Sequence, residues 1–317
     1  MLSIDSINDK INNRVYFQQH KSEEGKMEII RTIKEMQNLS KKLTSKGAVI
    51  GCVPTMGYLH EGHLNLIRKA KEISDYVVMT LFVNPKQFGP NEDFEKYPRD
   101  PDRDYKLAEN AGCDLIFAPD IIEMYPIGFS TSVEIHNITS KFEGECRPGH
   151  FDGVALVVAK LFNAVKPDVA VFGQKDYQQT LVIKQLVRDL NFDIKIVIAP
   201  TVRETDGLAM SSRNTYLTPE LRAKANVLFN ALEDAIKAIE GGCRERKVIN
   251  AIMHKRLRSV PEIKIDYACA ALAENLDEPD VFLAGDHIVL LIACYLGTTR
   301  LIDNALVTIP KTNIATK

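Results

Sequence analysis

The sequence predicts an α/β fold with a doubly wound parallel sheet, followed by a smaller C-terminal α+β domain. Short apolar runs at 48–53 and 75–83 alternate with helical segments, which is typical of strands buried on both faces of a parallel sheet. After about residue 201 the pattern changes to paired helices and two apolar strands. We therefore expect one domain over 27–201 and a smaller one over 202–317.

The composition is that of an ordinary globular protein of 317 residues. It is 45% apolar and 26% charged, with a net charge of −2, so neither a nucleic-acid surface nor a membrane surface is indicated. No apolar run approaches the ~20 residues of a membrane span. Six scattered cysteines form no CxxC pair, as expected of reduced thiols in the cytoplasm. Residues 1–26 are polar and without a targeting signal, and we predict an extension with no assigned function.

The elements follow the alternation in order. Helical spacing over 28–46, ended by Gly47, predicts a helix before the first strand. The polar loop 84–101 is long, and such loops inside compact domains are often functional. Between them and beyond, we expect a helix to residue 73, strand 75–83, helix 102–111, strands 113–119 and 130–135, a helix opened by loop 147–153, strand 168–172, helix 177–190, strand 193–200, two helices in 218–259, and strands 263–272 and 286–296.

The stretch Val49–Ala70 carries the clearest chemical signal. A strand passes through a Pro-Gly loop into His60-Glu-Gly-His63 and then a helix. The N-terminus of such a helix offers unpaired N–H groups and a positive dipole end to an anion. Both imidazoles can lie on one side of its first turn and bind phosphate oxygens. The alternatives are structural histidines or half of a zinc site, for which the sequence marks no third ligand.

Further polar residues follow other predicted strands. Lys175 lies at the carboxyl end of a strand, where α/β sheets bind ligands, and Asp176 could bind a ribose or cap the next helix. The loop 210–213, Met-Ser-Ser-Arg, could clamp phosphate or simply cap a helix. Gln87 and Gln179 can recognise hydroxyls and carboxylates without adding charge, although each alone could be structural.

Taken together, these motifs resemble the pantothenate synthetases, or pantoate–β-alanine ligases. The pair HxGH alone indicates only the broader nucleotidylyltransferase superfamily, but the full set is more specific and covers about 27–310. The matching segments are Pro54–Gly57 with His60–His63, then 82–89, 147–151, 173–179, 202–214 and 297–304. The resemblance implies a Rossmann-like domain with a C-terminal lid domain.

It also implies a two-step ligation in the cytoplasm by a homodimer with no nucleic-acid or membrane partner. The carboxylate of pantoate attacks the α-phosphorus of ATP, giving pantoyl adenylate and pyrophosphate. The amine of β-alanine then attacks the acyl carbon, giving pantothenate and AMP. The implied contacts are His60 and His63 with the phosphates, Lys175, Ser211, Ser212 and Arg213 with the β- and γ-phosphates, Gly173 and Asp176 with the ribose, Met56 and Val202 beside ATP, Gln87 and Gln179 with pantoate, Asn84 with β-alanine, and Asp104 with Mg²⁺.

Two other functions remain open on the sequence. Another HxGH nucleotidylyltransferase would transfer its nucleotide to a phosphate, and would need a second cationic pocket for that acceptor. A non-catalytic metal-binding protein would use His60 and His63 structurally, but it leaves Lys175 and the 210–213 loop unexplained.

Overall fold

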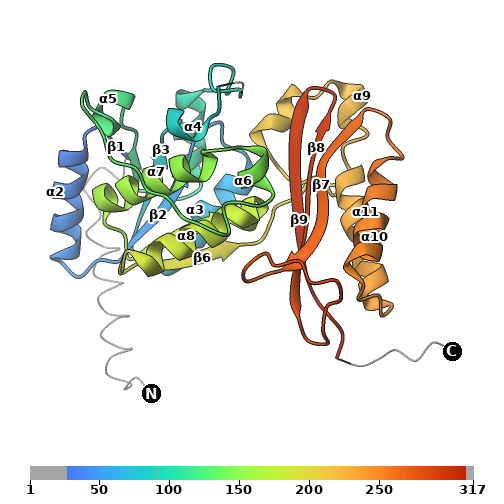
Figure 1. The fold of residues 1–317 in the computed structure, drawn as a ribbon. Coiled ribbons are helices and arrows are strands. Elements are labelled where there is room, and N and C mark those ends of the chain that lie inside the picture. Colours follow the sequence, from blue (N-terminus) through green and yellow to red (C-terminus); the bar gives the residue numbers. More distant parts are fainter. Residues whose placement is uncertain (1–26, 91, 312–317) are drawn as a thin grey trace.

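The computed structural model describes residues 27–90 and 92–311, arranged as a parallel α/β sheet beside a three-stranded antiparallel sheet (Figure 1). The predicted extension at 1–26 lies outside the described residues. Among them, no helix is long and apolar enough to cross a membrane.

The larger sheet has six strands in the order β1-β4-β3-β2-β5-β6. Every neighbouring pair is parallel, which confirms the predicted sheet. The strands are β1 Glu28–Ile30, β2 Ile50–Thr55, β3 Tyr76–Leu81, β4 Leu115–Phe117, β5 Val169–Gly173 and β6 Lys195–Ala199.

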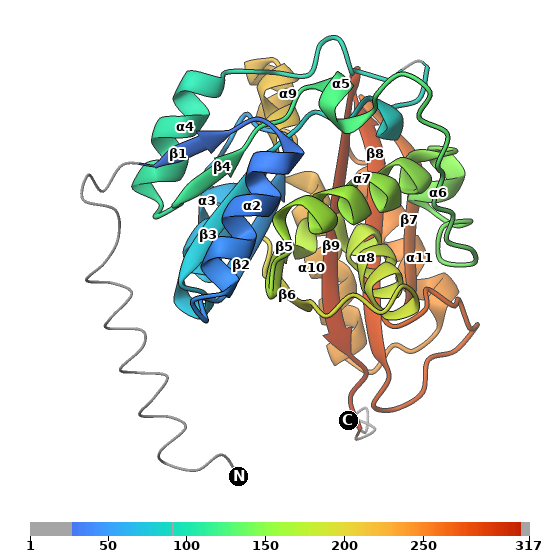
Figure 2. The same ribbon diagram turned by 90° about the vertical axis from the view of Figure 1, so that its left-hand side faces the viewer.

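Helices cover both faces of this sheet, because successive strand residues point to opposite sides. Cys52 and Val78 join a core with α2 (Ile33–Thr44) and α7 (His150–Val165). Val53 and Val77 join a second core with α3 (Glu61–Ile73). Figure 2 shows α2 and α7 in front of the strands. The helices of this part are α2 Ile33–Thr44, α3 Glu61–Ile73, α4 Pro101–Asn110, α5 Ile121–Met124, α6 Glu143–Cys146, α7 His150–Val165 and α8 Tyr177–Asp189, with 3₁₀ turns η1 Pro85–Gln87 and η2 Gln174–Asp176.

The direction of winding reverses between β2 and β5. From β2 the chain continues to β3 and β4 on one side, while β5 and β6 lie on the other. Gly51 and Cys52 pair directly with Val169 and Ala170. The loops that follow β2 and β5 therefore diverge from adjacent strand ends, which opens a crevice at the carboxyl edge of the sheet.

In the C-terminal part, the two longer helices, α10 (Val227–Glu240) and α11 (Arg246–Leu257), pack against one face of an antiparallel sheet. Its strands are β7 Ile263–Leu272, β8 His287–Leu296 and β9 Thr299–Thr308, and the short helix α9 is Pro219–Arg222. These elements share a core of their own. The element pattern predicted the first two strands, whereas β9 covers the segment 297–304 that was noted only for its family resemblance.

Two predicted elements were wrong. The helix expected over 28–46 begins only at Ile33, where Thr32 caps it, and Glu28–Ile30 instead forms an edge strand beside β4. The segment 130–135, predicted as a strand, pairs with no strand in the described part of the chain. Both segments are short. Whether such a segment forms a strand depends on pairing with a neighbouring strand, which the local sequence pattern does not reveal. The division into two domains near residue 201 stays a prediction.

Gly153 permits the close approach of α7 to η1. A Cβ on Gly153 would lie 2.7 Å from Cα of Gln87 and nearer still to the Lys86 carbonyl. Gly153→Ala must therefore displace η1, and we expect it to lower the free energy of unfolding by about 1–3 kcal/mol in urea denaturation. Gly89→Ala is the control, because its Cβ would stay 3.7 Å or more from Glu92. Equal urea midpoints for the two variants would contradict the argument.

Candidate active site

Two adjoining cavities open at the crevice between the strand ends. The smaller cavity, of about 220 Å³, lies over the carboxyl ends of β2 and β5. The larger cavity, of about 580 Å³, extends from it to β7, β8 and β9. Residues that line both cavities are Arg147, His150, Lys175, Asp176, Gln179, Ser211 and Arg213.

The predicted histidine pair begins helix α3 and lines the smaller cavity. Nδ1 of His60 accepts a hydrogen bond from the Gly62 amide at 3.2 Å, and Nδ1 of His63 accepts one from the His60 amide at 3.3 Å. The ring centroids are 4.1 Å apart. Because Nδ1 accepts in each ring, a neutral imidazole carries its proton on Nε2 and can donate it to a ligand.

Burial keeps both imidazoles neutral. It lowers the pKa of His60 to about 2, with His63, Lys175 and Arg103 adding repulsion. It lowers the pKa of His63 to about 4, against an opposing attraction from Asp176. At neutral pH the pair therefore offers two uncharged N–H donors rather than two cations.

Asp104 fixes the turn that leads into the histidine pair. Gly57 and Tyr58 both have left-handed backbone angles, with φ of 86° and 49°. The carboxylate of Asp104 accepts hydrogen bonds from the amides of Tyr58 at 2.6 Å and Leu59 at 2.7 Å. Asp104 is buried and lines neither cavity, so the structure does not bring this expected magnesium ligand to the site.

The second half of the site comes from β5 and the loop after β6. Lys175 follows β5, with Nζ 3.7 Å from the Asp176 carboxylate. Ser211 caps the 3₁₀ turn η3 (Ser212–Tyr216) by accepting from the Arg213 amide. The Ser212 hydroxyl donates to the carbonyl oxygen of Tyr58 at 3.3 Å, which joins this loop to the histidine loop. The sequence-predicted phosphate residues therefore do converge.

The rest of the smaller cavity suits a small molecule with hydroxyl groups and an apolar body. Gln87 and Gln179 supply amides, and the apolar wall includes Phe82, Val154, Val157, Leu161 and Phe172. Met56, Gly173 and Val202 line this cavity too.

Asn84 lies behind this wall. Its amide donates to the Gly153 carbonyl at 3.0 Å and to Oε1 of Gln87 at 3.2 Å, and its own Oδ1 accepts from Tyr125. It is 1% exposed and lines neither cavity. Asn84 is thus placed to hold Gln87 rather than to touch a substrate.

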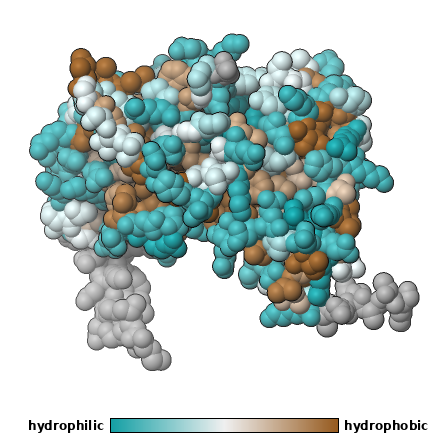
Figure 3. Space-filling view, in the orientation of Figure 1, coloured by the Kyte–Doolittle hydropathy of each residue, from teal (hydrophilic) through white to brown (hydrophobic). Residues whose placement is uncertain are grey.

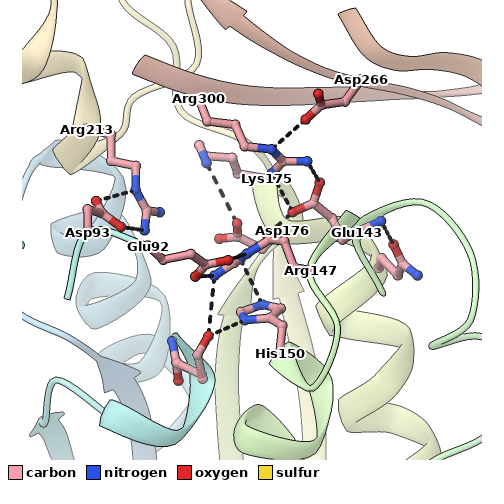
Figure 4. Close-up of polar contacts among 12 residues, drawn as sticks. Glu92, Asp93, Glu143, Arg147, His150, Lys175, Asp176, Arg213, Asp266 and Arg300 are labelled. Carbon is pink, nitrogen blue, oxygen red and sulfur yellow. Dashed lines mark hydrogen bonds and ion pairs between the residues drawn. The ribbon is translucent and has the colours of Figure 1, made fainter. Parts of the chain in front are cut away.

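Sequence reasoning gave no role to Arg147 and His150, which lie together beside the site (Figure 4) and both contact the backbone carbonyl of Gln87. His150 contacts the Gln87 carbonyl through Nδ1 at 2.8 Å and Arg147 through Nε2 at 3.1 Å. Burial lowers the pKa of His150 to about 4, so Nε2 accepts from the guanidinium. The signal was available, because the Arg147–His150 loop opens a helix just as the His60 loop does.

Ion pairs surround the cavities. The adjacent residues Glu92 and Asp93 hold Arg147 and Arg213, at 2.6 Å and 2.8 Å respectively (Figure 4). On the far wall Arg300 of β9 makes two hydrogen bonds to Glu143, at 2.6 Å and 2.8 Å. The Arg300 pair connects the antiparallel sheet to the α/β part across the larger cavity.

The chain is similar over most of its length to known proteins of one family. The family model for pantoate-beta-alanine ligase matches residues 28–306. A pantothenate synthetase of Moorella thermoacetica is 53% identical over 278 residues, which is 88% of this chain and 98% of that protein. The crystal structure of the pantothenate synthetase from Thermus thermophilus has a TM-score of 0.81 at 45% identity, covering 88% and 99% of the two chains. A pantoate-beta-alanine ligase from Francisella tularensis, complexed with beta-gamma ATP and beta-alanine, has a TM-score of 0.73 at 34% identity, covering 89% and 98%.

The lowered histidine pKa values predict a stability that declines in mild acid. Below a pH of about 6.5 the unfolded chain takes up protons on His60, His63 and His150 that the folded chain refuses. The free energy of unfolding should therefore fall as the pH drops from 6.5 toward 4, by about 1.4 kcal/mol per pH unit for each histidine. Urea denaturation at several pH values measures this slope. His63→Gln should make it shallower, and an unchanged slope would contradict the assignment.

Proposed function

The chain belongs to the pantoate–β-alanine ligase family, and we propose that its two adjoining cavities form the site of that reaction. It is an ATP-dependent ligase that condenses pantoate with β-alanine to pantothenate, through pantoyl adenylate, with release of pyrophosphate and AMP. The observation that carries the site assignment is the convergence of the neutral pair His60 and His63 with Lys175, Ser211 and Arg213 on one cavity.

Pantoate fits the smaller cavity, beside Gln87, Gln179 and the apolar wall on α7. Gln87 and Gln179 bind its hydroxyl groups, and the apolar wall on α7 accepts its two methyl groups. Amides and apolar side chains suit a small hydroxy acid better than the phosphate acceptor of a nucleotidylyltransferase. The Thr201 hydroxyl, buried here without a partner among the described residues, is free to bond the nucleotide.

In the first step a carboxylate oxygen of pantoate bonds to the α-phosphorus of ATP. The bond to the bridging oxygen breaks, and pyrophosphate leaves with that electron pair. Nε2–H of His60 and His63 donates to the α-phosphate oxygens, where negative charge grows in the transition state. Lys175, Ser211, Ser212 and Arg213 hold the departing phosphates, and Gly173, Asp176, Met56 and Val202 contact the nucleoside.

In the second step the neutral amine of β-alanine bonds to the acyl carbon. The carbon–oxygen bond to AMP breaks, AMP keeps its electron pair, and the amine proton passes to water. Neither step needs an enzyme nucleophile, since positioning and charge stabilisation supply the catalysis. The site must also exclude water from the adenylate.

Mg²⁺ would enter with ATP. The described residues contain no cluster of three or more His, Cys, Asp or Glu that could hold a metal. Mg²⁺ commonly keeps water ligands and binds through substrate phosphates plus one or two carboxylates, and Asp176 is the half-exposed carboxylate that lines both cavities. When bound, the ion would neutralise part of the phosphate charge.

We also propose a cytoplasmic homodimer with a C-terminal domain that begins near residue 202. The six cysteines are free thiols, which suits a reducing compartment. Apolar side chains at the corner around α5 are exposed, namely Ile121 by 44%, Ile122 by 63% and Ile127 by 98% (Figure 3). Such a patch on a soluble surface suits an interface between copies. The separate cores of the two sheets support the division into domains.

A direct assay tests the proposed function. The purified chain is incubated with ATP, pantoate and β-alanine, and AMP, pyrophosphate and pantothenate are measured. Equal amounts of the three products are expected, and none should appear without pantoate. Pyrophosphate release without AMP or pantothenate would instead indicate a nucleotidylyltransferase.

Loss of one imidazole should impair the chemical step. His63→Ala removes a donor to the developing charge, and we expect kcat to fall by roughly 10²–10³-fold with the fold intact. Steady-state kinetics measures the loss, and circular dichroism checks the fold. His136→Ala is the matched control, because His136 is exposed and lines neither active-site cavity. Wild-type kcat in the His63 variant would remove this imidazole from the mechanism.

A further inference from the structure

The position of Arg147 assigns it a role in acceptor binding, on the basis of the proposed function. We propose that Arg147 binds the carboxylate of β-alanine, in the place that the carboxylate of Glu92 occupies in the structure. The assignment concerns the third substrate, for which the sequence suggested only Asn84, a residue that lines neither cavity.

Arg147 lies where the smaller cavity opens into the larger one. It lines both, and it precedes helix α7, whose residues His150, Val154 and Val157 form one wall of the smaller cavity. Its Nη2 is 3.4 Å from the Gln87 carbonyl, and its Nη1 is 3.1 Å from Nε2 of His150. The guanidinium thus lies beside the proposed pantoate site, where the two cavities adjoin.

The structure already places a carboxylate in the fork of this guanidinium. Nε of Arg147 donates to Oε1 of Glu92 at 2.7 Å, and Nη2 donates to Oε2 at 2.6 Å. Burial alone would raise the pKa of Glu92, but the Arg147 guanidinium keeps it below its ordinary value, so this carboxylate is ionised. Bidentate pairing of this kind is specific to planar anions with two oxygens. The carboxylate of β-alanine has the same shape and charge.

Three other cations around the cavities are less suited to this role. Lys175 and Arg213 belong to the proposed phosphate contacts, so a carboxylate there would compete with ATP. Arg300 has its donors committed to Glu143 and Asp266. Arg147, by contrast, exchanges one carboxylate for another, and Glu92, which is partly exposed, can return to water.

Anchoring at Arg147 also predicts that the enzyme selects amino acid acceptors by the length of their carbon chain. The amine of β-alanine lies two methylenes from its carboxylate, so a fixed carboxylate sets how far the amine reaches toward the acyl carbon. An α-amino acid would hold its amine one methylene closer to Arg147 and farther from the reacting carbon.

The test compares two acceptors on the same enzyme, β-alanine and β-alaninamide, which keeps the amine and lacks the carboxylate. In Arg147→Gln, kcat/KM for β-alanine should fall by about 10- to 100-fold, the effect of losing a charge-assisted hydrogen bond. The value for β-alaninamide should change far less, so the preference between the two collapses. An equal fall for both acceptors would overturn the proposal, because Arg147 would then act through His150 or Gln87.

A second variant leaves Arg147 in place. Glu92→Gln removes the competing carboxylate, so the KM for β-alanine should fall while that for β-alaninamide stays the same. Glu145→Gln is the matched control, because Glu145 is an exposed carboxylate on the neighbouring α6 that lines neither cavity. A KM for β-alanine that is unchanged or higher in Glu92→Gln overturns the proposed displacement, even if Arg147→Gln fails to fold.

Pantoate-dependent exchange of pyrophosphate into ATP, without any acceptor, tests the proposed function separately. If the wild-type chain catalyses no exchange, the proposed function fails and this inference falls with it. If the wild type exchanges but Arg147→Gln does not, Arg147 serves adenylation and the inference alone is overturned. Exchange by both, with the altered acceptor preference, supports it.

Discussion

The active site depends on the direct parallel pairing of β2 with β5. These strands are distant in sequence, yet Cys52 lies beside Ala170, so their carboxyl ends emerge together. The histidine loop follows one strand and Lys175 follows the other. Because the winding reverses here, no crossover helix within residues 27–90 and 92–311 fills the space above the two strand ends. A shift of either strand would separate the imidazoles from Lys175 and the serine loop, the proposed phosphate contacts, without altering either motif.

In the proposed reaction, the helix that follows β2 contacts the phosphate through its two imidazoles rather than through its own N–H groups. Sequence reasoning assigned the phosphate to the free N–H groups at the start of α3. In the structure two amides in that region, those of His60 and Gly62, already donate to imidazole nitrogens. These bonds orient both rings and leave Nε2–H as the group available to the proposed phosphate ligand. The rings thus extend the donor capacity of the helix end into the cavity, and burial keeps them from becoming cations at neutral pH.

The local sequence pattern was sufficient to predict strands that are buried on both faces and loops that carry a clear motif. It predicted the parallel strands β2 to β6 and the histidine pair, whereas the meeting of Lys175 with the serine loop followed from the family resemblance. It failed where a distant partner decides. Glu28–Ile30 becomes a strand only because β4 lies beside it, and Asn84 turns inward because α7 approaches at Gly153. Glu92 and Asp93 look in sequence like ordinary solvated charges, since their arginine partners come from other loops.

Those partners determine the electrostatics of ligand binding. Arg147 and Arg213 are partly buried, and an unpaired guanidinium there would lose hydration without compensation. Instead, each arginine pairs with a carboxylate from the same loop. A phosphate or carboxylate ligand has to replace that carboxylate, so its binding free energy is only the difference between the two ion pairs. Because Glu92 and Asp93 are neighbours in the chain, a ligand that displaces one carboxylate also removes a restraint on the other. One short segment of loop thus holds both arginines.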